Sequence, residues 1–182
     1  MKNLLFIFLG FILSAQLNAQ TWMPADTGLQ SFLAAGKMEE FNGELYVTSS
    51  TPWGDFPYYI GKWNGSSWAT IPGELKPTSA TSSSNHFVNR VGSYNGYLVA
   101  VGRFDSIDNV ACHNIALWDG QQWTAVDTTR FVEAYLPGYE GQILDAVEYN
   151  GDLYIGGSFM FPFSGLAKWN GISWSEVGAT SG

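Results

Sequence analysis

Hydrophobic and polar positions alternate along this chain in three similar stretches. Each stretch begins with an Asn-Gly pair and an apolar run, and it ends with the pattern Trp-Asn/Asp-Gly-x-x-Trp. The first pairs stand at 42–43, 95–96 and 150–151, the second at 64–65, 119–120 and 170–171, so the pattern recurs every 51 to 55 residues. A period of this length indicates stacked structural repeats, and propeller blades fit it best.

Each repeat is predicted to contain four antiparallel strands. Asn-Gly between alternating apolar residues favours a two-residue hairpin turn, in which both turn residues adopt positive φ. Two such turns in each repeat predict two hairpins. In the first repeat, over about 37–75, we expect strands near 37–41, 44–48, 58–63 and 66–71. The second and third repeats should extend over about 90–127 and 145–178.

The second turn also predicts how its two strands pair. Counting outward from it places a small residue opposite each second tryptophan: Gly61 opposite Trp68, Ala116 opposite Trp123, and Ala167 opposite Trp174. Cross-strand neighbours lie about 5 Å apart. We therefore expect the small residues to make room for the indole rings.

The first hairpin of each repeat is apolar on both faces. In the third repeat, Leu153 and Ile155 share one face, while Tyr149 and Tyr154 take the other. A sheet of this kind is covered on both sides. This pattern favours blades that are sandwiched between other blades.

The third repeat, "YNGDLYIGGSF...LAKWNGISWSEVG", resembles the kelch repeat, with an apolar strand that leads into Gly156-Gly157 and a Trp five residues beyond Trp169. The segment "LVAVGRFDSIDNVACHNIALWDGQQWTAV" of the second repeat looks like secreted bacterial propeller repeats grouped with galactose-oxidase and kelch-like domains. The resemblance covers residues 37–178 and implies a β-propeller. The first repeat departs from it, because Ser49-Ser50 replace the glycine pair.

The expected fold is all-β: three four-stranded antiparallel blades, residues 37–182, of an incomplete propeller. Propellers close with about four to eight blades, so we expect further blades beyond Gly182. Within residues 20–36, the segment Thr21-Trp22-Met23-Pro24 resembles the last strand of a repeat. It is predicted to be an N-terminal strand without its own blade.

Residues 1–19 are predicted to be a signal peptide. Lys2 precedes the apolar run Leu4 to Leu13, and the small residue Ala19 ends the segment. The protein should therefore be secreted or held at the cell surface, and no other segment is apolar enough to span a membrane.

With 16 acidic and 8 basic side chains the net charge is −8, so nucleic acid is excluded as a partner. A single cysteine, Cys112, leaves no intrachain disulfide.

Two groups of residues have the chemistry of metal ligands. The galactose-oxidase resemblance implies that a copper site is worth testing, and Cys112-His113 is the one Cys/His pair. Adjacent residues of a strand point in opposite directions, so we favour a structural role for both. Asp105, Asp108 and Asn109 could bind calcium through oxygen atoms, but their spacing favours a solvated turn. We expect no cofactor.

Two predicted loops between the second and third strands are rich in aromatic residues. One contains Trp53, Phe56, Tyr58 and Tyr59, and the other contains Phe159, Phe161 and Phe163. Exposed rings can bind sugars or a protein, but they can equally pack against the next blade. We favour packing, and the candidate ligand-binding residues are Trp53, Phe56, Tyr58, Phe161 and Phe163.

The leading functional hypothesis is an exported, non-enzymatic propeller module that binds or displays a protein or glycan partner. One alternative is the propeller part of a secreted oxidase or glycan-acting enzyme. Another is a self-assembling structural protein. A chain of only three repeats is expected to self-associate, because its end blades would expose apolar faces.

Overall fold

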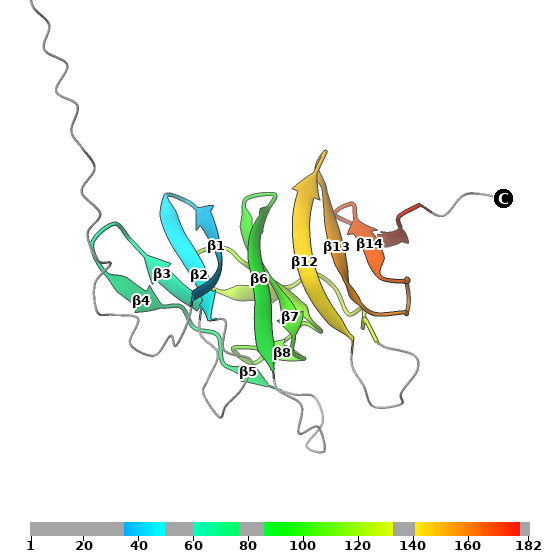
Figure 1. Cartoon of the computed structure of the whole chain (residues 1–182), viewed down its shortest axis with the longest axis horizontal. Helices are drawn as coiled ribbons and strands as arrows, with labels where there is room; N and C mark the ends of the chain where they lie inside the picture. The colour runs from blue at the N-terminus through cyan, green and yellow to red at the C-terminus, as the bar shows by residue number, and fades with distance from the viewer. Residues whose placement is uncertain (1–34, 50–59, 77–85, 133–140, 179–182) are drawn as a thin grey trace, which may run out of the picture.

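The computed structural model describes residues 35–49, 60–76, 86–132 and 141–178, and all regular structure in these ranges is β-strand (Figure 1). Across the same ranges no helix is long and apolar enough to cross a membrane. The predicted signal peptide and N-terminal strand lie outside the described residues, as do Trp53, Phe56, Tyr58 and Tyr59. The all-β class is confirmed.

Each repeat forms one four-stranded antiparallel sheet. The first contains β1 (Ala35–Phe41), β2 (Glu44–Ser49), β3 (Ile60–Trp63) and β4 (Trp68–Thr70). The second contains β6 (Phe87–Tyr94), β7 (Tyr97–Arg103), β10 (Ile115–Trp118) and β11 (Trp123–Ala125). The third contains β12 (Gln142–Tyr149), β13 (Asp152–Ser158), β14 (Leu166–Trp169) and β15 (Trp174–Glu176). A small sheet joins β5 (Leu75–Lys76), β8 (Ser106–Ile107) and β9 (Val110–Ala111).

The first turn of each repeat has the predicted conformation. Asn42, Asn95 and Asn150 adopt φ values of 53°, 47° and 53°, and the glycine after each is also positive. Asparagine and glycine tolerate this left-handed region better than other residues. The Asn-Gly pairs therefore fix three equivalent two-residue hairpin turns.

The second turn differs from the prediction, because it is a four-residue loop between the two tryptophans. The Asn64 side chain accepts hydrogen bonds from the backbone amides of Ser66 (2.9 Å) and Ser67 (3.0 Å). Asp119 and Asn170 bond the matching amides of their own loops. Only the glycine of each pair has positive φ. The polar side chain at the first loop position holds the turn in place of a second left-handed residue.

The longer loop changes the strand register, so the predicted pairing of small residues with tryptophans is wrong. Gly61 lies opposite Thr70, Ala116 opposite Ala125, and Ala167 opposite Glu176. The tryptophans lie opposite each other instead, with ring centroids 5.3, 5.2 and 5.3 Å apart in the three sheets, at tilts of 45°, 48° and 49°. Each sheet therefore carries one tryptophan pair of nearly constant geometry.

The tryptophan pair defines one side of each sheet, which we call the tryptophan face. The opposite side, the tyrosine face, carries Phe41 and Tyr46 in the first sheet, Tyr94 and Val99 in the second, and Tyr149 and Tyr154 in the third. One core joins Phe41 and Tyr46 to Trp118 and Trp123. The other joins Tyr94 and Val99 to Trp169. The tryptophan face of each later sheet thus packs on the tyrosine face of the sheet before it.

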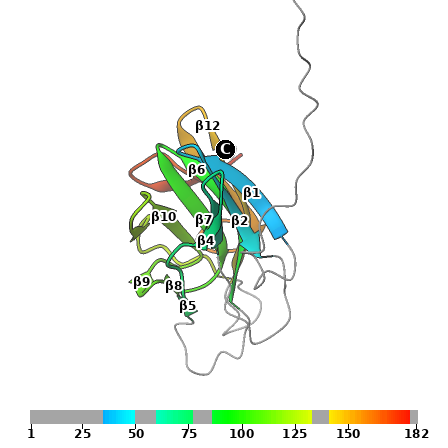
Figure 2. The same cartoon turned by 90° about the vertical axis from the view of Figure 1, so that its left-hand side faces the viewer.

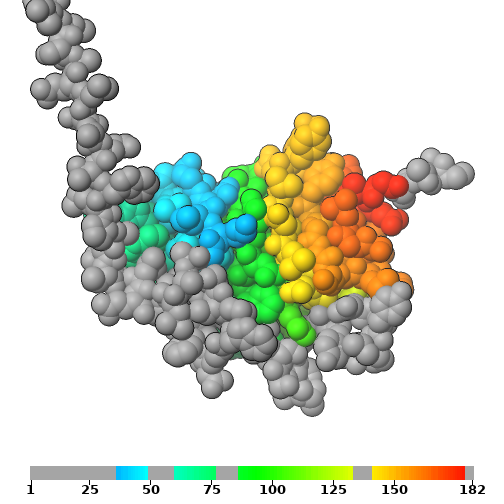
Figure 3. Space-filling view, viewed as in Figure 1, coloured from blue at the N-terminus to red at the C-terminus, as the bar shows by residue number. Residues whose placement is uncertain are grey.

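The three sheets lie side by side in sequence order, one behind another when viewed from the first (Figure 2). Strand β6 contacts β1 on one side and β12 on the other, and the three strands follow one another across the surface in Figure 3. The second sheet is buried on both faces, with Leu98, Val99, Ala100 and Val101 all fully buried. The prediction of a sheet sandwiched between two others is confirmed for this repeat.

Candidate functional site

The candidate site lies at the end of the sheets opposite to the Asn-Gly turns, which we call the loop end (Figure 1). The connection from β7 to β10, the connection from β13 to β14, and the small sheet of β5, β8 and β9 lie there. Variable loops on a rigid sheet scaffold are the common location of binding residues.

Asp108 and Asn109 form the turn of the β8–β9 hairpin. Both have positive φ, 48° and 65°, and Ile107 pairs with Val110 across the turn. The Asp108 amide donates to the Glu74 carbonyl at 3.0 Å, and Lys76 Nζ donates to Asn109 Oδ1 at 2.9 Å. These contacts attach the hairpin to β5. The prediction of a turn is confirmed at these two residues.

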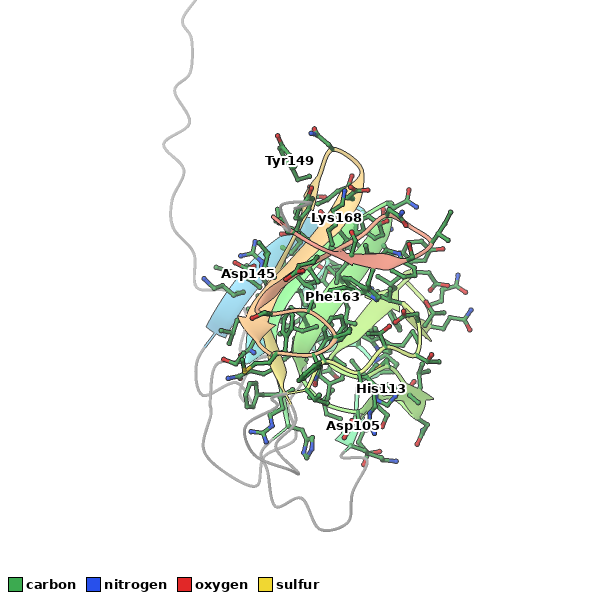
Figure 4. All side chains as sticks on the ribbon, turned by 90° about the vertical axis from the view of Figure 1, so that its right-hand side faces the viewer. Asp105, His113, Asp145, Tyr149, Phe163 and Lys168 are labelled. Atoms are coloured by element: carbon green, nitrogen blue, oxygen red, sulfur yellow. The ribbon has the colours of Figure 1, made fainter. Side chains whose placement is uncertain are left out.

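The prediction of a solvated turn is wrong for Asp105, because its carboxylate is buried, with only 4% of the residue exposed. Arg130 Nη2 lies 3.1 Å from Asp105 Oδ1, and His113 Nδ1 lies 3.4 Å from the same oxygen. Asp105 and His113 are labelled in Figure 4. Opposite charge and hydrogen bonding offset the cost of burying the carboxylate. Among the described residues, no group of three or more His, Cys, Asp or Glu side chains is arranged to hold a metal ion.

Asp105 interacts with both histidines of the chain: its carboxylate lies beside the His113 ring, and its charge affects the pKa of His86. Burial lowers the pKa of His86; the Asp105 charge raises it in part, and Arg103 lowers it further. The His86 imidazole is therefore neutral at pH 7. His113 lies in a turn with φ of 41°. Cys112 and His113 are in a loop and not in an extended strand, because His113 and Asn114 form the turn that leads into β10.

The side chains of Cys112 and His113 nevertheless lie in different environments. Cys112 is 1% exposed and belongs to the core between the first and second sheets, while the His113 ring lies beside Asp105. Burial raises the pKa of the Cys112 thiol to about 12; a backbone hydrogen bond at Ile107 lowers it in part, and the Asp105 charge raises it. Metal binding and nucleophilic attack both require the thiolate. The buried thiol is therefore unsuited to either role in the folded protein.

We expect Cys112 to resist alkylation by iodoacetamide at pH 8 and to react fully once the chain is unfolded in guanidinium chloride. The raised folded-state pKa also means that the protonated thiol contributes stability below pH 9, which is lost as the pH rises towards 12. Mass spectrometry of the alkylated protein gives the readout. Rapid labelling of the native chain would contradict the buried position.

Asn114 and Arg130 are important residues of the loop end that the sequence did not identify. The Asn114 side chain accepts a hydrogen bond from the Phe104 amide at 2.8 Å and donates one to the Gly141 carbonyl at 2.8 Å. It thereby joins the loop after β7 to the segment before β12. Asparagine is favoured at its φ of 75°, and this tolerance is the only local signal in the sequence.

The aromatic loop after β13 is mostly a packing element, as predicted. Phe159 is 2% exposed and contacts Phe131, with ring centroids 4.9 Å apart, and Phe163 packs against the same core. Phe161 is different, since 59% of it is exposed. Of the proposed ligand-binding residues that the structure describes, Phe161 is therefore the ring available to a ligand, and Phe163 supports the loop.

No model of a known protein family matches the chain, and no curated protein matches it with significant similarity. The kelch-like resemblance therefore rests on the repeat pattern itself. The structure supports the coarser conclusion that three similar antiparallel sheets are stacked in sequence order, an arrangement compatible with a propeller.

Proposed function

We propose that this chain is part of an exported β-propeller that binds or displays a protein or glycan partner at its loop end. The observation that supports the proposal is the repeated stacking of a tryptophan face on a tyrosine face, which is expected if each sheet is one blade. Stacked blades provide a rigid scaffold, and their loops at one end remain available for recognition. The predicted signal peptide at 1–19 supports export.

The loop end offers a ligand an aromatic ring and a cationic side chain. Phe161 exposes its ring, and Arg130 is about half exposed in its side chain, at 48%. An exposed ring can stack on a sugar or an apolar side chain, while a guanidinium donates several hydrogen bonds. This combination suits a neutral or acidic glycan, or an acidic protein loop.

Binding can be tested with the chain from residue 20 onward, immobilised and screened against a glycan array. We expect a glycan signal that the Phe161→Ala variant loses. Ile172→Ala is the matched control, because Ile172 is 85% exposed on the β14–β15 turn at the other end of the sheet. Equal loss in both variants, or no glycan bound, would contradict glycan recognition at the loop end.

An enzyme remains the second candidate, and the cluster of Asp105, His113 and Arg130 is the observation that favours it. A buried carboxylate that orients an imidazole is a common element of catalytic sites. Copper titration tests the oxidase version of this hypothesis. Stoichiometric binding that His113→Ala abolishes would favour it over the binding module.

A further inference from the structure

The tyrosine face of the third sheet is not covered by any other described sheet. Val147 is 56% exposed, Tyr149 62% and Leu166 41%. Tyr149 and Lys168 both lie on this side of the molecule (Figure 4). At the places that Tyr149 and Leu166 occupy, the second sheet has Tyr94 and Ile115, which are 5% and 2% exposed under the third sheet.

This exposed face repeats a pattern that is buried in the first sheet. Tyr149 and Tyr154 meet edge to face at 6.0 Å and 71°, and Phe41 and Tyr46 at 5.9 Å and 67°. An ion pair accompanies each ring pair: Lys168 with Asp152 at 2.6 Å, and Lys62 with Glu44 at 3.0 Å. Phe41 and Tyr46 are only 5% and 1% exposed, because the tryptophan face of the second sheet covers them.

The surface that would complete this face is present at the other end of the stack. It is the tryptophan face of the first sheet, where Met38 occupies the position held by Val91 and Ala146 in the other sheets. Met38 is 59% exposed, whereas Val91 and Ala146 are 1% and 3% exposed. Trp63 and Trp68 are partly exposed, while Trp118 and Trp123 are buried.

We propose that the uncovered tyrosine face of the third sheet binds the tryptophan face of the first sheet in a second copy of this chain. Both halves of an interface that the chain uses twice internally thus lie at opposite ends of the stack. Met38 is exposed on the tryptophan face of the first sheet, while Val47 beside it is 1% exposed. Contacts of this head-to-tail kind either close a ring or extend into a filament. Two copies together would have six sheets, and closed propellers have about four to eight blades.

The charges on the exposed face are compatible with burial. Lys168 is already paired with Asp152, so that covering the face would not leave an isolated charge. Leu166 and Val147 add apolar area beside the ion pair. The inference rests on the packing of the sheets and not on the ligand-binding role proposed above, so its failure would leave that role open.

The test uses one substitution on each face of the chain from residue 20 onward: Leu166→Arg on the tyrosine face and Met38→Arg on the tryptophan face. Both side chains are exposed in a single copy, so neither substitution should unfold it. Sedimentation velocity from about 1 to about 100 µM detects association with a dissociation constant of about 100 µM or tighter. Ile172→Arg, at an exposed apolar residue of the β14–β15 turn, is the matched control.

We expect the unsubstituted chain and Ile172→Arg to self-associate, and Leu166→Arg and Met38→Arg each to be monomeric when alone. An equimolar mixture of the two monomeric variants should form a dimer, because one still has an intact tryptophan face and the other an intact tyrosine face. Self-association of Met38→Arg alone would overturn the proposal in favour of a symmetric contact between tyrosine faces. A monomeric unsubstituted chain would also overturn it, and a further repeat or an unrelated partner would then cover this face.

Discussion

Substituting Trp123 with alanine should lower the free energy of unfolding by about 3 to 5 kcal/mol, the range for removing a large buried aromatic side chain. Trp123 is 3% exposed, and its ring lies against Trp118 in the core between the first two sheets. Its Nε1 also donates a hydrogen bond to the Pro72 carbonyl, just after β4. The substitution therefore removes packing within one sheet and contact between two. Denaturant unfolding monitored by circular dichroism gives the value.

Trp68 provides a matched control, because it holds the same position in the first sheet. It forms the same kind of pair with Trp63 but is only partly buried, since no described sheet packs on that face. Trp68→Ala should cost less than half as much as Trp123→Ala. Equal losses would mean that the tryptophan pair stabilises its own hairpin and contributes little between sheets.

Gly157→Ala should destabilise the protein by about 3 kcal/mol, at the upper end of the usual range for overpacking. A Cβ at this position would collide with the Gln142 carbonyl oxygen and lie 2.9 Å from Ile143 Cα. Both are backbone atoms of β12 beside an irregularity in its pairing with β13, so neither can rotate away. The strand would have to shift. Gly102 faces the Phe87 carbonyl in the same way, so the second and third sheets share this close approach, whereas the first sheet has Ser49 at this place.

Gly156→Ala is the control for this prediction, because a Cβ there would meet its nearest atoms at 3.9 Å. We expect its effect to stay within about 0.5 kcal/mol, as for most substitutions away from tight packing. Thermal unfolding of the two variants side by side makes the comparison. A similar loss in both would indicate that glycine flexibility, and not close backbone approach, is what position 157 requires.

The sequence predicted the repeats, their strands and the first turns, because these depend on local signals that recur three times. The second turns show the limit of local reasoning. Asn64-Gly65 has the same sequence as Asn42-Gly43. However, the backbone amides of the two residues after Gly65 donate hydrogen bonds to the Asn64 side chain. A four-residue loop results, and the register moves so that Trp63 meets Trp68.

The loop end was less predictable, since its contacts join residues that are distant in the chain. Asp105 is 25 residues from Arg130, and no pattern in either segment indicates the pairing. Asn114 reaches Gly141 across 27 residues. By contrast, the packing of Phe159 could be predicted, because it lies in an aromatic loop. The structure places it in the core between the second and third sheets. Pairings of single polar residues depend on the folded geometry, and one sequence does not specify them.

The second and third sheets each pack their tryptophan face on the tyrosine face of the sheet before, and we propose that the three sheets are successive blades of a propeller. A crystal structure of the chain tests it most directly. We expect the three Trp pairs to superpose when the sheets are superposed, and one rotation to relate the first sheet to the second and the second to the third. Two different rotations, or a pair of sheets packed through other faces, would contradict the blade arrangement.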